Sequence, residues 1–330
     1  MRSPLNKRLF RELRGEFGKY LVSFILMTLT IGMVSGFLVA DGSMIQAYEE
    51  SFEKYSIENG HFRTEKKMNN AQIQDIEDLG IKLYENYYVE EALTNGSTMR
   101  IFKNRDEVNK VCLMKGTMPE KPGEIGIDRM YADNNDLSVG DEIESGGHTW
   151  KITGLVALSD YSALFSNNND SMFDSVKFGV SVVCPEEFDS YKADQLNYSY
   201  AWKYNTEPKN EKAEKDISED LMEDVAKEVT LEEFVPRYTN QAIIFTGDDM
   251  GGDRSMMIVL LYIIIVIMAF VFAITTSNTI RKEANVIGTL RASGYTRGEL
   301  IRHYMAAPVF VTFIGAIIGN VIGYTVGKDY

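Results

Sequence analysis

The sequence is poor in the residues from which catalytic centres are built. Its 330 residues include three histidines and two cysteines, and no histidine stands near a Ser or Cys in a nucleophile motif. The chain also lacks a G-x-x-x-x-G-K-S/T loop, which excludes ATP binding by a Walker mechanism. We therefore predict a non-catalytic chain with no metal site and no cofactor.

Charged residues are absent from three long apolar runs, residues 20–40, 255–277 and 304–327. Each run has roughly the 20 residues that a membrane helix needs. A span without an ionisable residue at its centre offers no pathway for an ion or a proton. The sequence thus predicts three membrane spans that form no pathway for ions or protons.

Basic and acidic residues are divided unevenly between the segments that separate these runs. Residues 1–19 carry six basic and two acidic side chains, residues 278–302 carry five and two, and residues 41–254 carry 22 and 43. Because Lys and Arg favour the cytoplasmic side, we expect residues 1–19 and 278–303 in the cytoplasm. Residues 41–254 and the end at 328–330 are then extracytoplasmic. The acidic excess argues against nucleic acid as a partner.

The amino-terminal segment has the pattern of a helix that lies on a membrane. Leu5, Leu9, Leu13 and Phe17 recur every fourth residue with basic side chains between them. This spacing predicts an amphipathic elbow helix over residues 1–19 that contacts membrane lipid; a disordered basic tail is the alternative. The first apolar run is too long for a signal-peptide core and has a poor cleavage site, so we expect it to be retained.

Residues 41–254 are predicted to fold as an α+β domain inserted between the first and second spans. The expected fold class is therefore an α-helical membrane protein with a large extracytoplasmic α+β domain. A polar helix over residues 43–55 is expected to continue the first span outward as a stalk. Short β-rich runs separated by Pro and Gly predict strands, and two further segments predict helices. The strands are 81–92, 98–102, 111–114, 124–127, 141–144, 148–158, 178–184 and 241–245, and the helices 128–134 and 211–229.

Two smaller features of this domain admit alternatives. Residues 247–252 are rich in Gly and Asp, and they read as a flexible hinge into the second span, because the spacing of a known calcium loop is absent. Cys112 and Cys184 both fall in the expected outer domain, where a disulfide can form. Two separate structural thiols are the alternative, since the sequence alone does not bring the cysteines together.

Small residues recur at every fourth position in the first and third spans. Gly32 and Gly36 lie in the first span, and a row of four glycines runs through the third: Gly315, Gly319, Gly323 and Gly327. Such rows let helix backbones approach closely in lipid. They predict a tight helix interface, either within this chain or across a homodimer.

The segment between the second and third spans reads as a basic hairpin. Val286, Ile287 and Leu290 share one face of a short helix, flanked by basic residues that include Arg291. A glycine at position 294 ends that helix, and T-x-x-E at 296–299 begins the next one. We expect the apolar face formed by Val286, Ile287 and Leu290 to dock a cytoplasmic partner. An ordinary cytoplasmic loop is the alternative.

The same segment resembles a known family. The run RKEANVIGTLRASGY at residues 281–295, in which Glu283 precedes an apolar turn and an L-R-A-x-G ending, is similar to the cytoplasmic hairpin of FtsX-like ABC transporter permeases. Residues 116–125 (GTMPEKPGEI), 137–141 and 150–155 resemble their MacB-like outer core domain. The order of elbow, span, outer domain, span, hairpin and span also agrees.

The resemblance implies a mechanism that the residues alone do not. In such permeases an ABC ATPase dimer docks on the hairpin, here at Glu283, Val286, Ile287, Leu290, Arg291 and Gly294. Its ATP-driven closure moves the outer domain for export or extraction of lipid, lipoprotein or peptide. A second permease copy, or the remaining segment of a longer permease, is the other implied partner.

One departure and two alternatives accompany the resemblance. The family has three spans after the outer domain, so we expect the chain to be an amino-terminal fragment of a longer permease or to be completed by another polypeptide. The competing function is a membrane sensor or scaffold that signals a ligand or the state of the cell wall without transport. An outer-domain hydrolase is the third possibility.

Overall fold

The computed structural model describes residues 14–145 and 147–328 and divides the chain into two compact units. The helical unit comprises residues 1–46 and 249–330, and the α+β unit comprises Ala47–Asp248. Most of the expected elbow helix, residues 1–13, lies outside the described residues, as do residues 329–330 of the expected extracytoplasmic end.

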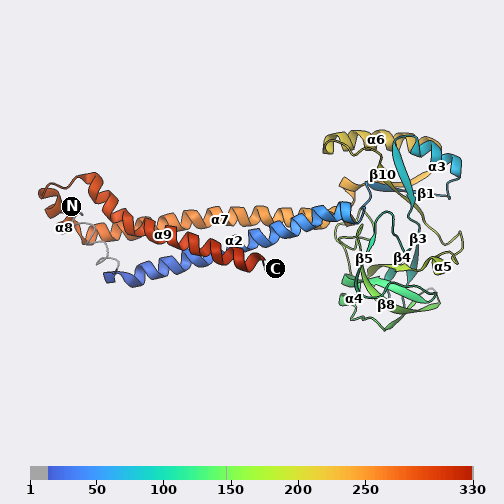
Figure 1. Cartoon of the computed structure of the whole chain (residues 1–330), viewed down its shortest axis with the longest axis horizontal. Helices are drawn as coiled ribbons and strands as arrows, with labels where there is room; N and C mark the ends of the chain where they lie inside the picture. The colour runs from blue at the N-terminus through green and yellow to red at the C-terminus, as the bar shows by residue number, and fades with distance from the viewer. Residues whose placement is uncertain (1–13, 146, 329–330) are drawn as a thin grey trace. The chain divides into compact units, whose positions relative to one another are not determined.

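Three long helices dominate the helical unit: α2 (Phe17–Lys54), α7 (Gln241–Lys282) and α9 (Arg297–Lys328). By length and composition, each could cross a membrane. A short helix, α8 (Ala284–Ala292), lies between α7 and α9 (Figure 1). The predicted fold class is confirmed, because a large α+β domain stands between the first and second of these helices.

The start of α7 contradicts two predictions. Residues 241–245, expected as a strand, and residues 247–252, expected as a hinge, both belong to one continuous helix. The side chain of Asn240 accepts a hydrogen bond from Ala242 N at 3.1 Å and starts this helix, which outweighs the β propensity of Ile243 and Ile244. Gly247 serves packing rather than bending, since a Cβ there would lie 2.6 Å from the Tyr48 ring.

A four-stranded sheet forms one part of the α+β unit. Its order is β11 (Leu231–Pro236), β1 (Gly60–Thr64), β10 (Tyr198–Tyr204) and β2 (Ile81–Glu85). Helices α3 (Asn70–Glu77) and α6 (Glu211–Glu228) lie on one side of it (Figure 1). Side chains alternate between the faces of a strand, so buried Phe62, Tyr200 and Trp202 share a face and stack together.

A seven-stranded mixed sheet forms the other part. Its order is β3-β4-β9-β6-β8-β5, with β7 paired to β8. The central strand β9 is buried along its whole length, as expected of a strand covered on both faces. The strands are β3 (Tyr88–Ala92), β4 (Thr98–Lys103), β5 (Val111–Gly116), β6 (Glu124–Asp128), β7 (Glu142–Ser145), β8 (His148–Leu158) and β9 (Phe178–Val183). Short helices are α4 (Arg129–Asn134), α5 (Pro185–Phe188) and η1 (Arg237–Thr239).

Most of the strands predicted from sequence are present, with two kinds of error. Residues 81–92, expected as one strand, form β2 and β3, which belong to different sheets. Six elements were missed: β1, α3, α5, β10, β11 and η1. The alternating aromatic residues of β10, in YSYAWKY, are the signal that could have revealed it.

The two cysteines are free thiols in the structure. Cys184 is 2% exposed, and the Sγ of Cys112 accepts a hydrogen bond from the Tyr55 hydroxyl at 3.2 Å. Of the two alternatives, the structure therefore contains separate thiols.

Candidate functional site: the hairpin and the glycine contacts

The hairpin begins where α7 ends. Glu283 interrupts the helix there, with φ −99° and ψ 13°, and α8 starts at the next residue. The hydroxyl of Tyr304 donates a hydrogen bond of 2.5 Å to the Glu283 carboxylate. Because Tyr304 belongs to α9, this bond ties the α7–α8 junction to the helix that follows the hairpin.

The chain reverses after α8 through a complete left-handed cap. Gly294 has φ +95°, and its N–H donates to Arg291 O at 3.1 Å while the N–H of Tyr295 donates to Leu290 O at 3.2 Å. These two bonds satisfy carbonyls that the end of α8 would leave unpaired. A side chain at position 294 would be strained in this conformation, so glycine defines the direction of the reversal.

The next helix starts at the capping box that the sequence predicts. Thr296 N and Thr296 Oγ1 each lie 2.8 Å from Glu299 Oε2, and Glu299 N donates to Thr296 Oγ1 at 3.3 Å. The hydrogen bond from the Thr296 N–H, followed by that from its hydroxyl, lowers the pKa of Glu299. Glu299 therefore stays ionised and fixes the first turn of α9.

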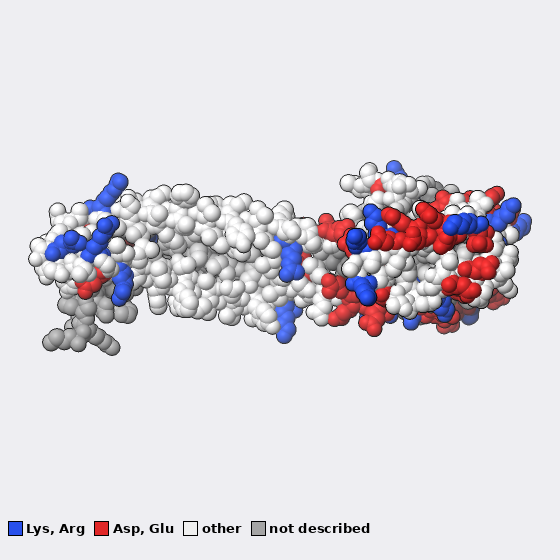
Figure 2. Space-filling view, turned by 90° about the horizontal axis from the view of Figure 1, so that it is seen from above, with Lys and Arg blue, Asp and Glu red and all other residues white. Residues whose placement is uncertain are grey.

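The apolar face of α8 is open. Val286 is 39% exposed, Ile287 and Leu290 are partly exposed, and every residue of α8 has some accessible surface. Lys and Arg side chains gather at this end of the helical unit, next to a broad stretch of α7 and α9 without charge (Figure 2). The predicted docking residues thus lie on one short helix, with Arg291 beside the apolar face.

The structure brings the glycines of the first and third spans together within one chain. A Cβ added at Gly319 would lie 2.9 Å from Thr28 O, and one added at Gly323 would lie 2.5 Å from Gly32 O. Gly315 faces Met27 and Thr28, and Gly327 faces Gly36. The Thr28 hydroxyl also donates to Gly315 O at 3.4 Å. Helices α2 and α9 therefore cross with their backbones nearly touching.

One link between helices was missed from sequence. Lys19 Nζ, counted only as a basic residue, donates to Thr279 Oγ1 at 2.8 Å and so joins α2 to α7. No sequence signal indicates this pairing. Within residues 14–145 and 147–328, no group of three or more His, Cys, Asp or Glu side chains could hold a metal ion.

A family model matches the carboxyl-terminal part of the chain. Residues 258–330 match the family described as FtsX-like permease C-terminal. The matched residues cover most of α7, all of α8 and α9, and therefore the whole hairpin. This match confirms the resemblance read from residues 281–295. No curated protein matches the chain.

Two solved structures resemble the chain. The periplasmic region of MacB from Actinobacillus actinomycetemcomitans is 11% identical, with a TM-score of 0.29, over 52% of this chain and 85% of that one. The extracellular domain of the noncanonic ABC-type transporter YknZ from Gram-positive bacteria is 12% identical, with a TM-score of 0.29, over 51% and 94%. Both TM-scores are low. The fold of Ala47–Asp248 is therefore defined by its own strand order and not by these similarities.

Proposed function

We propose that this chain is the permease subunit of an ABC transporter of the FtsX type, and that a separate ATPase dimer docks on its hairpin from the cytoplasm. The observation that carries the proposal is the exposed apolar face of α8, held by a glycine-dependent reversal inside the segment that matches FtsX-like permeases. An exposed apolar face adds nothing to the packing of α8 within the chain, and such faces mark sites of protein contact.

Each hairpin residue has a distinct role in this proposal. Val286, Ile287 and Leu290 supply apolar contact area, and Arg291 supplies charge at its rim. Gly294 sets the angle between α8 and α9. Glu283, through its bond to Tyr304, transmits movement of α8 to α9.

Closure of the ATPase dimer then moves the long helices, and work reaches the α+β unit without substrate passing between them. The apolar spans contain no ionisable residue that could line a polar path. The α+β unit acts on the extracytoplasmic side, in export or extraction of a lipid, lipoprotein or peptide. A second permease copy or a further permease segment completes the membrane assembly.

The experiment combines two hairpin variants with two matched controls. Val286→Asp places a charge in the contact, and Gly294→Val forces a β-branched residue toward positive φ; both should abolish ATPase co-purification and ATPase stimulation in lipid. Asn285→Asp adds the same charge roughly 150° around α8 from the centre of its apolar face. Gly288→Ala adds a methyl group in open space. Both controls should behave as wild type.

Tryptophan fluorescence checks that the α+β unit stays folded in every variant, because Trp150 and Trp202 are both fully buried there. If the two hairpin variants retain wild-type binding and stimulation, the segment is a connecting loop, and the sensor or scaffold function takes precedence.

A further inference from the structure

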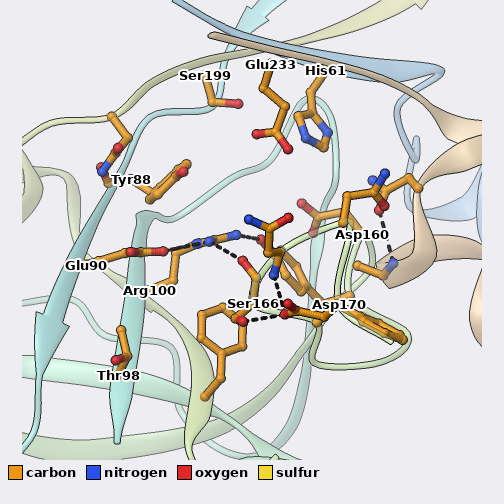
Figure 3. A pocket seen from close by; sticks show the side chains of 18 of the residues that line it. His61, Tyr88, Glu90, Thr98, Arg100, Asp160, Ser166, Asp170, Ser199 and Glu233 are labelled. Carbon is orange, nitrogen blue, oxygen red and sulfur yellow. Dashed lines mark hydrogen bonds and ion pairs between the residues drawn. The ribbon is translucent and has the colours of Figure 1, made fainter. Parts of the chain in front are cut away.

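A cavity of about 590 Å³ lies within the α+β unit. Strands of both sheets and the loop after β8 line it. Ser199, Glu233 and His61 enter it from the four-stranded sheet, and Tyr88, Glu90 and Arg100 from the seven-stranded one (Figure 3). Its volume falls within the range of roughly 300–1,000 Å³ that is typical of ligand sites.

The four-stranded sheet turns a polar face to this cavity. Its other face packs against α3 and α6 and carries the aromatic residues. Strand alternation therefore directs Arg63 to the cavity side, where it lies opposite Ser199 on β10 and Glu233 on β11. These three residues form one cross-strand row.

The arginine of the opposite wall is already engaged and is not an anion receptor. Arg100 lies between the rings of Tyr88 and Phe178, 4.5 and 5.0 Å from their centroids. Its guanidinium donates to Glu90 at 2.6 and 2.9 Å, to the Tyr161 hydroxyl at 2.7 Å and to a backbone carbonyl at 2.8 Å. Four of its five N–H donors are thereby used within the protein.

Two buried polar side chains face the cavity with hydrogen-bonding capacity left over. Ser199 is 4% exposed and Asn86 6% exposed. Among the described residues, the Ser199 hydroxyl has no partner, and Asn86 uses only its Oδ1, which accepts from Arg105 at 2.9 Å. Asn86 N donates to Ser199 O at 2.9 Å, so these two unsatisfied groups are neighbours. The free Ser199 Oγ and Asn86 Nδ2 are accessible from the cavity rather than sealed in the core, so a ligand that enters the cavity can bond to both.

The carboxylate at the other end of the row is also open. Glu233 Oε2 lies 3.7 Å from Arg63 Nε, too far for a hydrogen bond. Around it, the lining contains six carboxylates and three Lys or Arg side chains: Glu58, Glu90, Asp160, Asp170, Asp174 and Glu233 against Arg63, Arg100 and Lys177. Glu90, Asp160 and Glu58 are paired with Arg100, Arg105 and His61. Asp170, Asp174 and Glu233 then remain against Arg63 and Lys177, and this smaller excess of negative charge favours a cationic ligand.

We propose that this cavity binds a lysine-bearing peptide end, with a ligand ammonium on Glu233 and a neighbouring ligand oxygen on Ser199 and Asn86. Ammonium-to-carboxylate hydrogen bonds are among the strong ones. The Ser199 hydroxyl and the Asn86 side-chain amide then hydrogen-bond to the ligand, because protein partners do not use their full bonding capacity. This binding requires no ATPase, so it stands independently of the function proposed for the hairpin.

The probe is trilysine, titrated calorimetrically into the full chain in detergent micelles without any ATPase. Glu233→Gln should weaken binding by about tenfold or more, since a charged hydrogen bond is lost. Ser199→Ala should weaken it by roughly threefold or more. Glu219→Gln removes the same charge from the exposed surface of α6, where Glu219 is 61% exposed, and should bind as wild type.

A second peptide tests recognition of the ammonium itself. Trilysine acetylated on every side chain and on its amino terminus should bind at least tenfold more weakly than trilysine, a loss comparable to that of one charged hydrogen bond. Equal binding of the two peptides, no binding of trilysine, or wild-type binding by both Glu233→Gln and Ser199→Ala would overturn the proposal. Tryptophan fluorescence identifies any variant that fails to fold. If one of Glu233→Gln and Ser199→Ala does not fold, binding by the other tests the proposal.

Discussion

Gly323 of α9 lies so close to Gly32 of α2 that a Cβ built on Gly323 falls 2.5 Å from Gly32 O. Backbone, rather than a movable side chain, occupies that space. The helices cannot keep this distance if Gly323 gains a side chain, because close-packed backbones do not yield easily.

Gly323→Ala should therefore loosen the α2–α9 contact by roughly 1–3 kcal/mol, the usual cost of overpacking. Gly298→Ala in the same helix is the matched control, since nothing lies within 4 Å of a Cβ there. Disulfide crosslinking between cysteines on α2 and α9, compared at equal oxidant, measures the contact. Equal crosslinking in both variants would show that the glycine contact does not hold the helices together.

The second prediction concerns the side of the membrane on which each segment lies. With Cys112 and Cys184 replaced, a cysteine at Met172, which is 77% exposed, should react with an impermeant thiol reagent in intact cells. A cysteine at Ser293 should react only after permeabilisation, because basic hairpins favour the cytoplasm. Labelling at position 293 in intact cells would refute the proposed orientation.

The third prediction concerns the buried pair of Arg105 and Asp160. Their side chains are 7% and 5% exposed, and two N–H···O bonds of 2.7 Å join them. Asp160→Asn leaves Arg105 buried without a charged partner, so the α+β unit should lose about 3–5 kcal/mol of unfolding free energy.

Glu219→Gln is the control for this loss, because Glu219 and Lys215 are each 61% exposed and 4.0 Å apart. An exposed pair of this kind contributes at most about 0.5 kcal/mol. Urea unfolding of the full chain, followed by tryptophan fluorescence, reports the α+β unit, since both tryptophans lie there. Equal midpoints for the two variants would contradict the prediction.

The fourth prediction is a pH dependence centred on Glu58 and His61, which lie 2.6 Å apart. Burial acts to raise the pKa of Glu58, but the charge and hydrogen bond of His61 outweigh it and lower that pKa below 4.5. Burial likewise acts to lower the pKa of His61, but Glu58, with smaller contributions from Glu233 and Asp160, raises it above 6.5.

The two shifts define the window in which the pair stabilises the fold. The contribution of Glu58 is complete above 4.5 and is lost as the pH falls through its folded pKa. That of His61 is complete below 6.5 and is lost as the pH rises through its folded pKa. His61→Ala should thus destabilise the α+β unit most between 4.5 and 6.5. A difference from wild type that is constant from pH 4 to 9 would contradict this.

Local patterns revealed much of the chain, and they failed where a residue's role depends on distant neighbours. The apolar runs, the row from Gly315 to Gly327 and the turn at Gly294 could all be read from sequence, because each depends on spacing or on backbone conformation. Residues 241–245 were misread as a strand, since β-branched residues favour strands and the Asn240 cap was overlooked.

The sequence by itself determined that the chain has three apolar spans, a basic hairpin and an acidic α+β segment, because chain length, charge and periodicity are local properties. Only the tertiary structure decided that the glycines of α9 meet Gly32 and Gly36 within one chain, that the cysteines stay apart, and that Ser199, Arg63 and Glu233 align across three strands. Contacts of this kind join residues far apart in the chain. They are set by strand register and helix packing, which no local pattern encodes.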